Sequence, residues 1–162
     1  MLNEMNNWHK NRVEEAKVWV SMYPFLRIKD NSVYPWLNTE EIDDCWIIHD
    51  LPHGWVVGFA KQLCDELLDA LGEYTNDWII SQVKEKFGEM RIYHHFADKN
   101  WTSIQKEELK QIMSKLNEII NKYSYISSHT CVDCGEQAEI HTIQGWIAPY
   151  CNQCYVEKYK RD

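Results

Sequence analysis

The chain has 162 residues, of which 44% are hydrophobic and 13% aromatic, so it is long enough for one folded domain with a small appendage. Its formal charge of −8 at pH 7 argues against nonspecific nucleic-acid binding, because affinity for phosphates depends on Lys and Arg. No segment carries eighteen uninterrupted apolar residues, and the first residues lack the features of a signal peptide. We therefore expect a cytoplasmic protein with no membrane association.

The first third of the chain predicts one helix followed by irregular structure. Residues 3–22 place apolar side chains at loosely helical intervals, and Pro24 ends the pattern. Residues 25–52 are irregular, apart from a short strand that we expect at residues 45–48. Cys45 and Cys64 lie among apolar residues, so we expect both to be buried.

Two amphipathic helices follow. The first opens at Pro52-His53-Gly54 and ends before Gly72. Its apolar residues recur every four positions: Trp55, Phe59, Leu63, Leu67 and Leu71. The second begins at Thr102, whose hydroxyl can form a capping box with Gln105.

Between these helices, residues 77–96 predict a β-hairpin with Gly88-Glu89 as its two-residue turn. Alternation then places Val83, Phe87, Met90, Ile92 and Phe96 on one face. The opposite face carries Gln82, Lys84, Lys86, Arg91, Tyr93 and His95. Glu85 and His94 fall on the apolar face, where we expect them to pair diagonally across the strands.

The second of these faces concentrates three cations and two hydrogen-bonding rings on one side of an acidic protein. One interpretation is an ordinary solvated strand face. The other is a surface that binds an anion or nucleotide, or that docks an acidic segment of another protein.

Two Cys-x-x-Cys pairs near the C-terminus predict a metal site. The ligands are Cys131, Cys134, Cys151 and Cys154. This spacing matches structural zinc ribbons, and a cytoplasmic protein favours a metal over disulfides. We expect one structural Zn²⁺, with the residues between the pairs forming a second hairpin around Gln144-Gly145. His129 and His141 are not needed as ligands.

A second cluster with possible chemistry is His49-Asp50-Leu51-Pro52-His53. As a catalytic site, it would use His49 or His53 as a base oriented by Asp50. The alternative is helix capping by Asp50 beside structural histidines. The sequence contains no Gly-rich phosphate loop, nucleophile elbow or His-Glu-x-x-His motif.

The string Gln82-Val83-Lys84-Glu85-Lys86-Phe87-Gly88-Glu89-Met90-Arg91-Ile92-Tyr93 resembles a Gln-Val-Lys-Glu-Lys-Phe-Gly-Gly-Leu-Arg-Phe-Tyr signature. That signature is typical of a family of small, mostly uncharacterised phage and prophage proteins. Gly54-Trp55, Thr130 to Gly135 and Gly145-Trp146 resemble further motifs of the family. The resemblance spans roughly residues 54–154 and implies a phage or mobile-element origin, hence the host bacterial cytoplasm.

These observations predict an α+β fold in which a β-hairpin, a small antiparallel sheet, packs against amphipathic helices. Residues 1–126 would form this part, with an N-terminal segment at 1–53 and a helix–hairpin–helix core at 54–126, and residues 127–162 would form the zinc ribbon. No boundary other than the one before the first Cys pair is indicated.

For function, the leading hypothesis is a non-enzymatic accessory protein that binds a host bacterial protein or a small anionic ligand. By analogy with small phage proteins, an inhibitor of a bacterial antiviral defence system is one concrete form. The alternative is a nuclease or hydrolase that uses His49, Asp50 and His53. A transcription-associated adaptor ranks last, because only Lys158, Lys160 and Arg161 supply basic charge at the end of the ribbon. The oligomeric state stays open.

Overall fold

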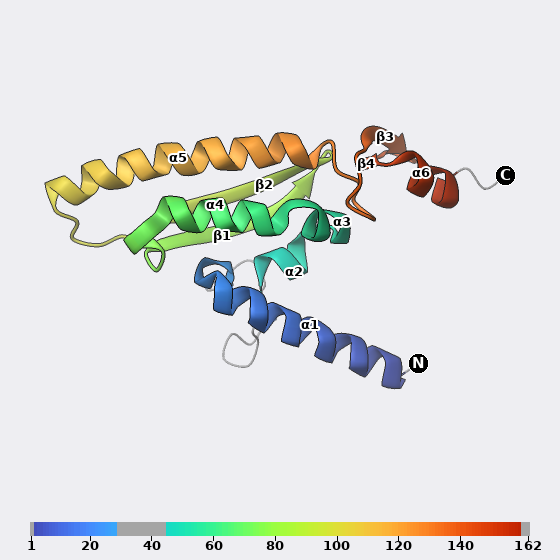
Figure 1. Ribbon diagram of the computed structural model, residues 1–162, viewed down its shortest axis with the longest axis horizontal. Helices are drawn as coiled ribbons and strands as arrows, with labels where there is room; N and C mark the ends of the chain where they lie inside the picture. The colour runs from blue at the N-terminus through green and yellow to red at the C-terminus, as the bar shows by residue number, and fades with distance from the viewer. Residues whose placement is uncertain (1, 29–44, 160–162) are drawn as a thin grey trace.

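The computed structural model describes residues 2–28 and 45–159, and within these ranges it leaves out the side chains of residues 2–10, 48 and 49. It confirms the α+β fold, with two two-stranded antiparallel sheets and their accompanying helices (Figure 1). The main elements are α1 (Leu2–Met22), α2 (Trp46–Asp50), α3 (His53–Trp55), α4 (Lys61–Leu71), β1 (Trp78–Lys86), β2 (Glu89–Phe96), α5 (Ser103–Ser127), β3 (Glu139–Ile143), β4 (Trp146–Tyr150) and α6 (Asn152–Tyr159).

In the N-terminal region, the structure confirms the predicted helix but not the predicted strand. The helix expected at residues 3–22 is α1. The strand expected at residues 45–48 is wrong, because Trp46–Asp50 is helical and Cys45 forms only an isolated β-bridge with Arg27. A short apolar run has the same pattern in a buried helix and in a buried strand, and here packing against β1 favours the helix. Residues 29–44 of the expected irregular segment lie outside the described residues.

The two amphipathic helices form where the sequence predicted them. The first runs from α3 to α4 through a π-helical turn at Val56–Ala60, and Gly72 ends it with a φ of +51°. The second, α5, begins with the predicted capping box: the Gln105 backbone N–H donates to the Thr102 hydroxyl at 3.2 Å, and the Gln105 side chain accepts from the Thr102 N–H at 3.0 Å.

The hairpin is present, but its turn lies one residue earlier than predicted. Phe87 and Gly88 occupy the turn, with φ angles of +55° and +83°. The strands therefore pair Glu85 with Met90 and Lys84 with Arg91, and an irregularity between Ile80 and Gln82 shifts the register of their outer halves. The expected Gly88-Glu89 turn and its pairs are thus wrong, and Phe87 leaves the apolar face.

The predicted diagonal pair of Glu85 and His94 is also wrong. The Glu85 carboxylate accepts a hydrogen bond from the Gly88 backbone N–H at 2.6 Å, so it stabilises the turn instead. His94 accepts from the Trp78 indole N–H at 3.0 Å, and its other ring nitrogen lies 3.1 Å from the Asn117 side-chain oxygen. Both polar groups near the apolar face are therefore satisfied locally rather than by each other.

One main core holds the helices and the first hairpin together. Helices α4 and α5 lie side by side along the hairpin (Figure 1). Their buried side chains join those of the hairpin and of α2 in one cluster, which includes Trp46, Leu63, Leu67, Val83, Met90 and Leu116. Cys45 and Cys64 are buried as expected. Among the described residues, none of the helices combines the length and apolar character that a membrane span requires.

Candidate functional site

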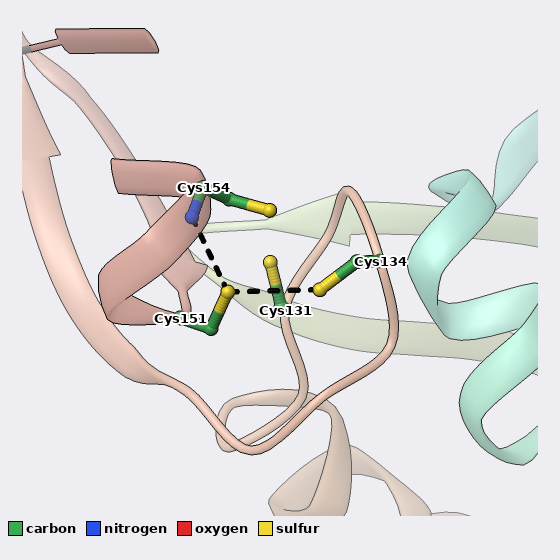
Figure 2. A group of neighbouring side chains, drawn as sticks. All are labelled: Cys131, Cys134, Cys151 and Cys154. Carbon is green, nitrogen blue, oxygen red and sulfur yellow. Dashed lines mark hydrogen bonds between the residues drawn. The ribbon is translucent and has the colours of Figure 1, made fainter. Parts of the chain in front are cut away.

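The four predicted cysteine ligands converge at the C-terminal end of the molecule. The sulfur atoms of Cys131, Cys134, Cys151 and Cys154 all lie within 4.8 Å of one another (Figure 2). The Cys134 and Cys151 sulfurs are 3.6 Å apart. Zn–S bonds of about 2.3 Å in a tetrahedron give S···S edges of about 3.8 Å. The four thiols are therefore positioned to bind one metal ion.

Local backbone structure places the two cysteine pairs. Gly135 adopts a φ of +83° directly after Cys134 and donates its backbone N–H to the Cys131 carbonyl at 3.0 Å, which closes the first turn tightly. In the second pair, Cys151 follows β4 and Cys154 lies in the first turn of α6, where its N–H contacts the Cys151 sulfur at 3.4 Å. The second pair thus continues into the short helix α6.

Without a metal ion, the surroundings of Cys131 and Cys154 shift the pKa values of these two thiols in opposite directions. Burial opposes ionisation of Cys131, but hydrogen bonds from the backbone of Cys151, Cys134 and Asp133 outweigh it and lower the pKa of this thiol. Burial, together with hydrogen bonds to the neighbouring thiols, raises the pKa of Cys154. A metal ion would compensate the mutual repulsion of four thiolates, so binding should release protons.

The ribbon, which comprises residues 130–159, is docked on the core through glycine contacts. The Gly54 N–H donates to the Val132 carbonyl at 2.8 Å. A Cβ atom on Gly54 would lie only 1.9 Å from the Cys131 carbonyl oxygen, so no other residue fits there without movement of the backbone. Beside it, the buried Trp55 indole donates to the Thr130 carbonyl at 2.9 Å. The Gly54-Trp55 pair at the start of the helix therefore also forms the surface against which the first cysteine turn packs.

The tip of the first hairpin also reaches the ribbon. A Cβ atom on Gly88 would lie 2.5 Å from the Ile140 side chain and near Pro149 and Ala148. Nearby, the Met90 N–H donates to the hydroxyl of Ser127, the last residue of α5, at 2.8 Å. The hairpin tip, the end of α5 and the ribbon thus meet at one place.

A pocket of about 480 Å³ opens at this junction. Its polar lining consists of Asp50, His53, Glu85 and Asp133, and its apolar lining includes Leu51, Val132 and Trp146. Lys158 binds one oxygen of Asp133 at 2.7 Å, while the other oxygen is buried and has no hydrogen-bond partner in the described part of the chain. We call this space the junction pocket.

The junction pocket gathers only part of the predicted catalytic cluster. Asp50 and His53 line it, but the side chain of His49 lies outside the described residues. Within the described part of the chain, no hydrogen bond joins the His53 ring to a carboxylate. Sequence reasoning missed Glu85, Asp133 and Trp146 as pocket residues, because only the docking of the ribbon brings them together and no local pattern signals that contact.

The predicted binding residues lie on the hairpin but outside the pocket. We call Gln82, Lys84, Lys86, Arg91, Tyr93 and His95 the polar face. Lys86, Arg91, Tyr93 and His95 are exposed, and Gln82 and Lys84 are half-buried. The Lys84 ammonium lies 5.1 Å from the centre of the Tyr93 ring, and Arg91 forms an ion pair with Glu89 at 2.7 Å. Glu89 therefore offsets one of the three cations on this side of the hairpin.

Comparisons with protein-family models, with curated proteins and with solved structures found no match. The resemblance to the phage family thus stays a sequence-based expectation, and the site is interpreted from its own geometry.

Proposed function

We propose that the four cysteines bind one Zn²⁺ ion and that its role is structural. Four thiolates at tetrahedral spacing are typical of structural zinc ribbons, and they leave no open coordination position for a substrate or a water molecule. Zinc would hold the ribbon in the shape that seats its first cysteine turn on Gly54 and Trp55. The metal would then act on function only through the surfaces that this docking creates.

We further propose that the protein is a non-enzymatic accessory protein that binds a host bacterial protein or a small anionic ligand through the polar face. One observation carries this proposal. The polar face keeps Lys86, Arg91 and His95 exposed, while buried residues such as Val83 and Met90 turn the other side of the hairpin toward the core. Exposed cations beside an aromatic ring suit carboxylate or phosphate groups.

The fuller form of this proposal is a phage-type protein that inhibits a bacterial antiviral defence system. It depends on the family resemblance and on the analogy with other small phage proteins. Nucleic acid is not the expected partner, because the whole chain carries a charge of −8.

A hydrolase or nuclease is the second candidate, and the junction pocket is the observation that favours it. The pocket brings Asp50 and His53 together with two further carboxylates, which is the kind of side chain that general acid–base catalysis uses. Against it, the polar face and this pocket do not converge on one cleft, as a shared substrate site would require.

Affinity capture from a bacterial lysate tests the binding proposal. We expect Lys84→Ala/Arg91→Ala to lose the captured partner that the wild-type protein retains. The matched control is Lys106→Ala/Lys110→Ala, which removes the same charge from the exposed side of α5 and should keep the partner. An unchanged partner list for the hairpin variant would contradict the proposal.

A turnover assay with bis(p-nitrophenyl) phosphate and with single- and double-stranded nucleic acids separates the two candidates. We expect no turnover by the zinc-loaded protein. Turnover that His53→Gln abolishes would overturn the non-enzymatic proposal in favour of a hydrolase.

A further inference from the structure

The turn of the first hairpin contains an exposed aromatic residue in an unfavourable backbone conformation. Phe87 has a φ of +55° and its side chain is 67% exposed. A two-residue hairpin turn with positive φ at both positions favours Asn or Asp followed by Gly, and a bulky residue at the first position is an outlier. Phe87 costs the turn stability, and most of its surface stays exposed in the monomer. Such strain is typical of residues with a binding role.

The surroundings of Phe87 hold it in place and add a positive charge. The Glu85 carboxylate fixes the turn through the Gly88 N–H at 2.6 Å. The Lys86 ammonium lies 5.5 Å from the centre of the Phe87 ring. We call Lys86 and Phe87 the hairpin tip. It presents an exposed apolar ring beside a cation.

The junction pocket has the complementary chemistry. Its walls include Leu51, Val132 and the side chain of Trp146, which is 59% exposed. It also carries the carboxylates of Asp50, Glu85 and Asp133, of which Asp133 already pairs with Lys158 at 2.7 Å. A volume of about 480 Å³ lies within the range of about 300–1,000 Å³ that accommodates small ligands, so the pocket has room for a benzyl ring.

The hairpin tip and the junction pocket are neighbours on the same end of the molecule. Glu85 connects them, because it lines the pocket and its carboxylate binds the N–H of Gly88 in the turn. A surface that carries both a projection and a complementary pocket is self-complementary, and a two-fold axis can satisfy both contacts at once.

We propose that the protein forms a symmetric homodimer in which Phe87 of each copy enters the junction pocket of the other. Trp146 packs against the entering ring, and Lys86 approaches the carboxylates of the opposite pocket. The dimer engages Lys86 of the polar face but leaves Lys84, Arg91 and Tyr93 available. It therefore goes beyond the proposed partner binding and does not depend on it.

Sedimentation equilibrium of the zinc-loaded protein tests the proposal. We expect the wild type to dimerise with a concentration dependence that Phe87→Asn weakens about tenfold or more, as removal of a central aromatic anchor does. Asn favours the backbone conformation of this turn, so this variant should be at least as resistant to denaturant as the wild type. A loss of association therefore cannot come from misfolding.

Ile104→Asn is the matched control, because Ile104 is 74% exposed on α5, away from the tip and the pocket. It should dimerise like the wild type. A wild-type chain that stays monomeric at about 100 μM, where a contact with a Kd of about 1 μM would be nearly saturated, would overturn the proposal. So would a Phe87→Asn variant that still dimerises like the wild type.

A mixing experiment tests the reciprocal geometry. Trp146→Ala removes a wall of the pocket but leaves the tip intact, and we expect it to dimerise poorly while keeping its zinc. Phe87→Asn keeps the pocket and lacks the tip. An equal mixture of the two variants should associate more than either alone, because one of the two contacts is then intact. A mixture that associates no more than the separate variants would contradict this interface.

Discussion

The core and the ribbon are stabilised by different means within one chain. Among the described residues, the core cluster contains 24 buried hydrophobic residues, whereas the ribbon cluster contains four: Cys131, Ala138, Ala148 and Tyr150. At about 25 cal/mol per Å² of buried apolar surface, so few side chains cannot offset the conformational entropy of the ribbon. The comparison indicates that the core can rely on burial, while the ribbon depends on its contacts with the core and on the metal ion that we propose.

The largest expected effect on zinc affinity comes from the loss of one of the proposed metal ligands. Cys151→Ser should lower zinc affinity more than about 100-fold, exceeding the 10- to 100-fold effects typical of outer-shell changes. A competition titration against a chelator measures this effect. Cys64→Ala is the control, because Cys64 is buried in the core and not in the ribbon. It should cost stability but leave zinc affinity unchanged. Equal zinc affinities for Cys151→Ser and the wild type would remove this cysteine from the site.

The next effect concerns the contact between the two regions. Gly54→Ala would place a Cβ atom 1.9 Å from the Cys131 carbonyl oxygen, so we expect a destabilisation of about 3 kcal/mol and weaker zinc binding. Gly145 has a φ of +85°, and a Cβ atom there would meet no other atom within 4 Å. Gly145→Ala should therefore cost only about 1 kcal/mol in the free energy of unfolding. Denaturant unfolding of the two variants measures the difference. Equal costs would show that the ribbon is not seated tightly on Gly54.

A smaller effect should be confined to the core. Thr102→Ala removes the hydroxyl that caps α5, and we expect a loss of about 1 kcal/mol in the free energy of unfolding. Zinc affinity should not change, because the capped end of α5 is remote from the cysteines (Figure 1). Changed zinc binding in this variant would mean that the two regions are coupled along the whole length of α5.

The smallest effect is a pH dependence of the core that involves His94. Burial lowers the pKa of His94, although the hydrogen bond to Asn117 opposes this shift. The Trp78 indole can only donate, so the ring nitrogen that it contacts must be unprotonated. The unfolded chain therefore binds a proton more readily, and stability falls as the pH drops below about 6.5 toward the lower folded-state pKa.

An NMR titration of the His94 ring checks this prediction directly, and it should give a pKa below about 6.5. His94→Gln should show a weaker fall in melting temperature over the same acidic range. A His94 pKa at or above the ordinary value would contradict the account.

Local sequence patterns were sufficient for the elements with strong periodicity or with specific end signals. The capping box at Thr102, the helix stop at Gly72 and the four cysteines depend on side chains close in sequence, and the structure contains all of these features. The short run at residues 45–48 failed because its pattern does not distinguish a buried helix from a buried strand.

The predicted position of the hairpin turn was wrong for a different reason. The sequence rule places a small or polar residue, and not Phe87, in the first turn position. The structure accepts Phe87 there because Glu85 binds the Gly88 N–H and because the ribbon packs against the turn. The junction pocket was unpredictable in the same way, since Glu85, Asp133 and Trp146 are brought together only by the docking of the ribbon.

Hydrogen–deuterium exchange of the zinc-loaded and chelator-stripped protein tests the difference between the two regions most directly. On removal of zinc, we expect residues 130–159 to lose protection, while the buried parts of α4 and α5 around Leu67 and Leu116 keep theirs. Loss of protection throughout the chain would show that the core also needs the metal. Unchanged protection of the ribbon would show that burial and docking alone hold it, which would contradict the account.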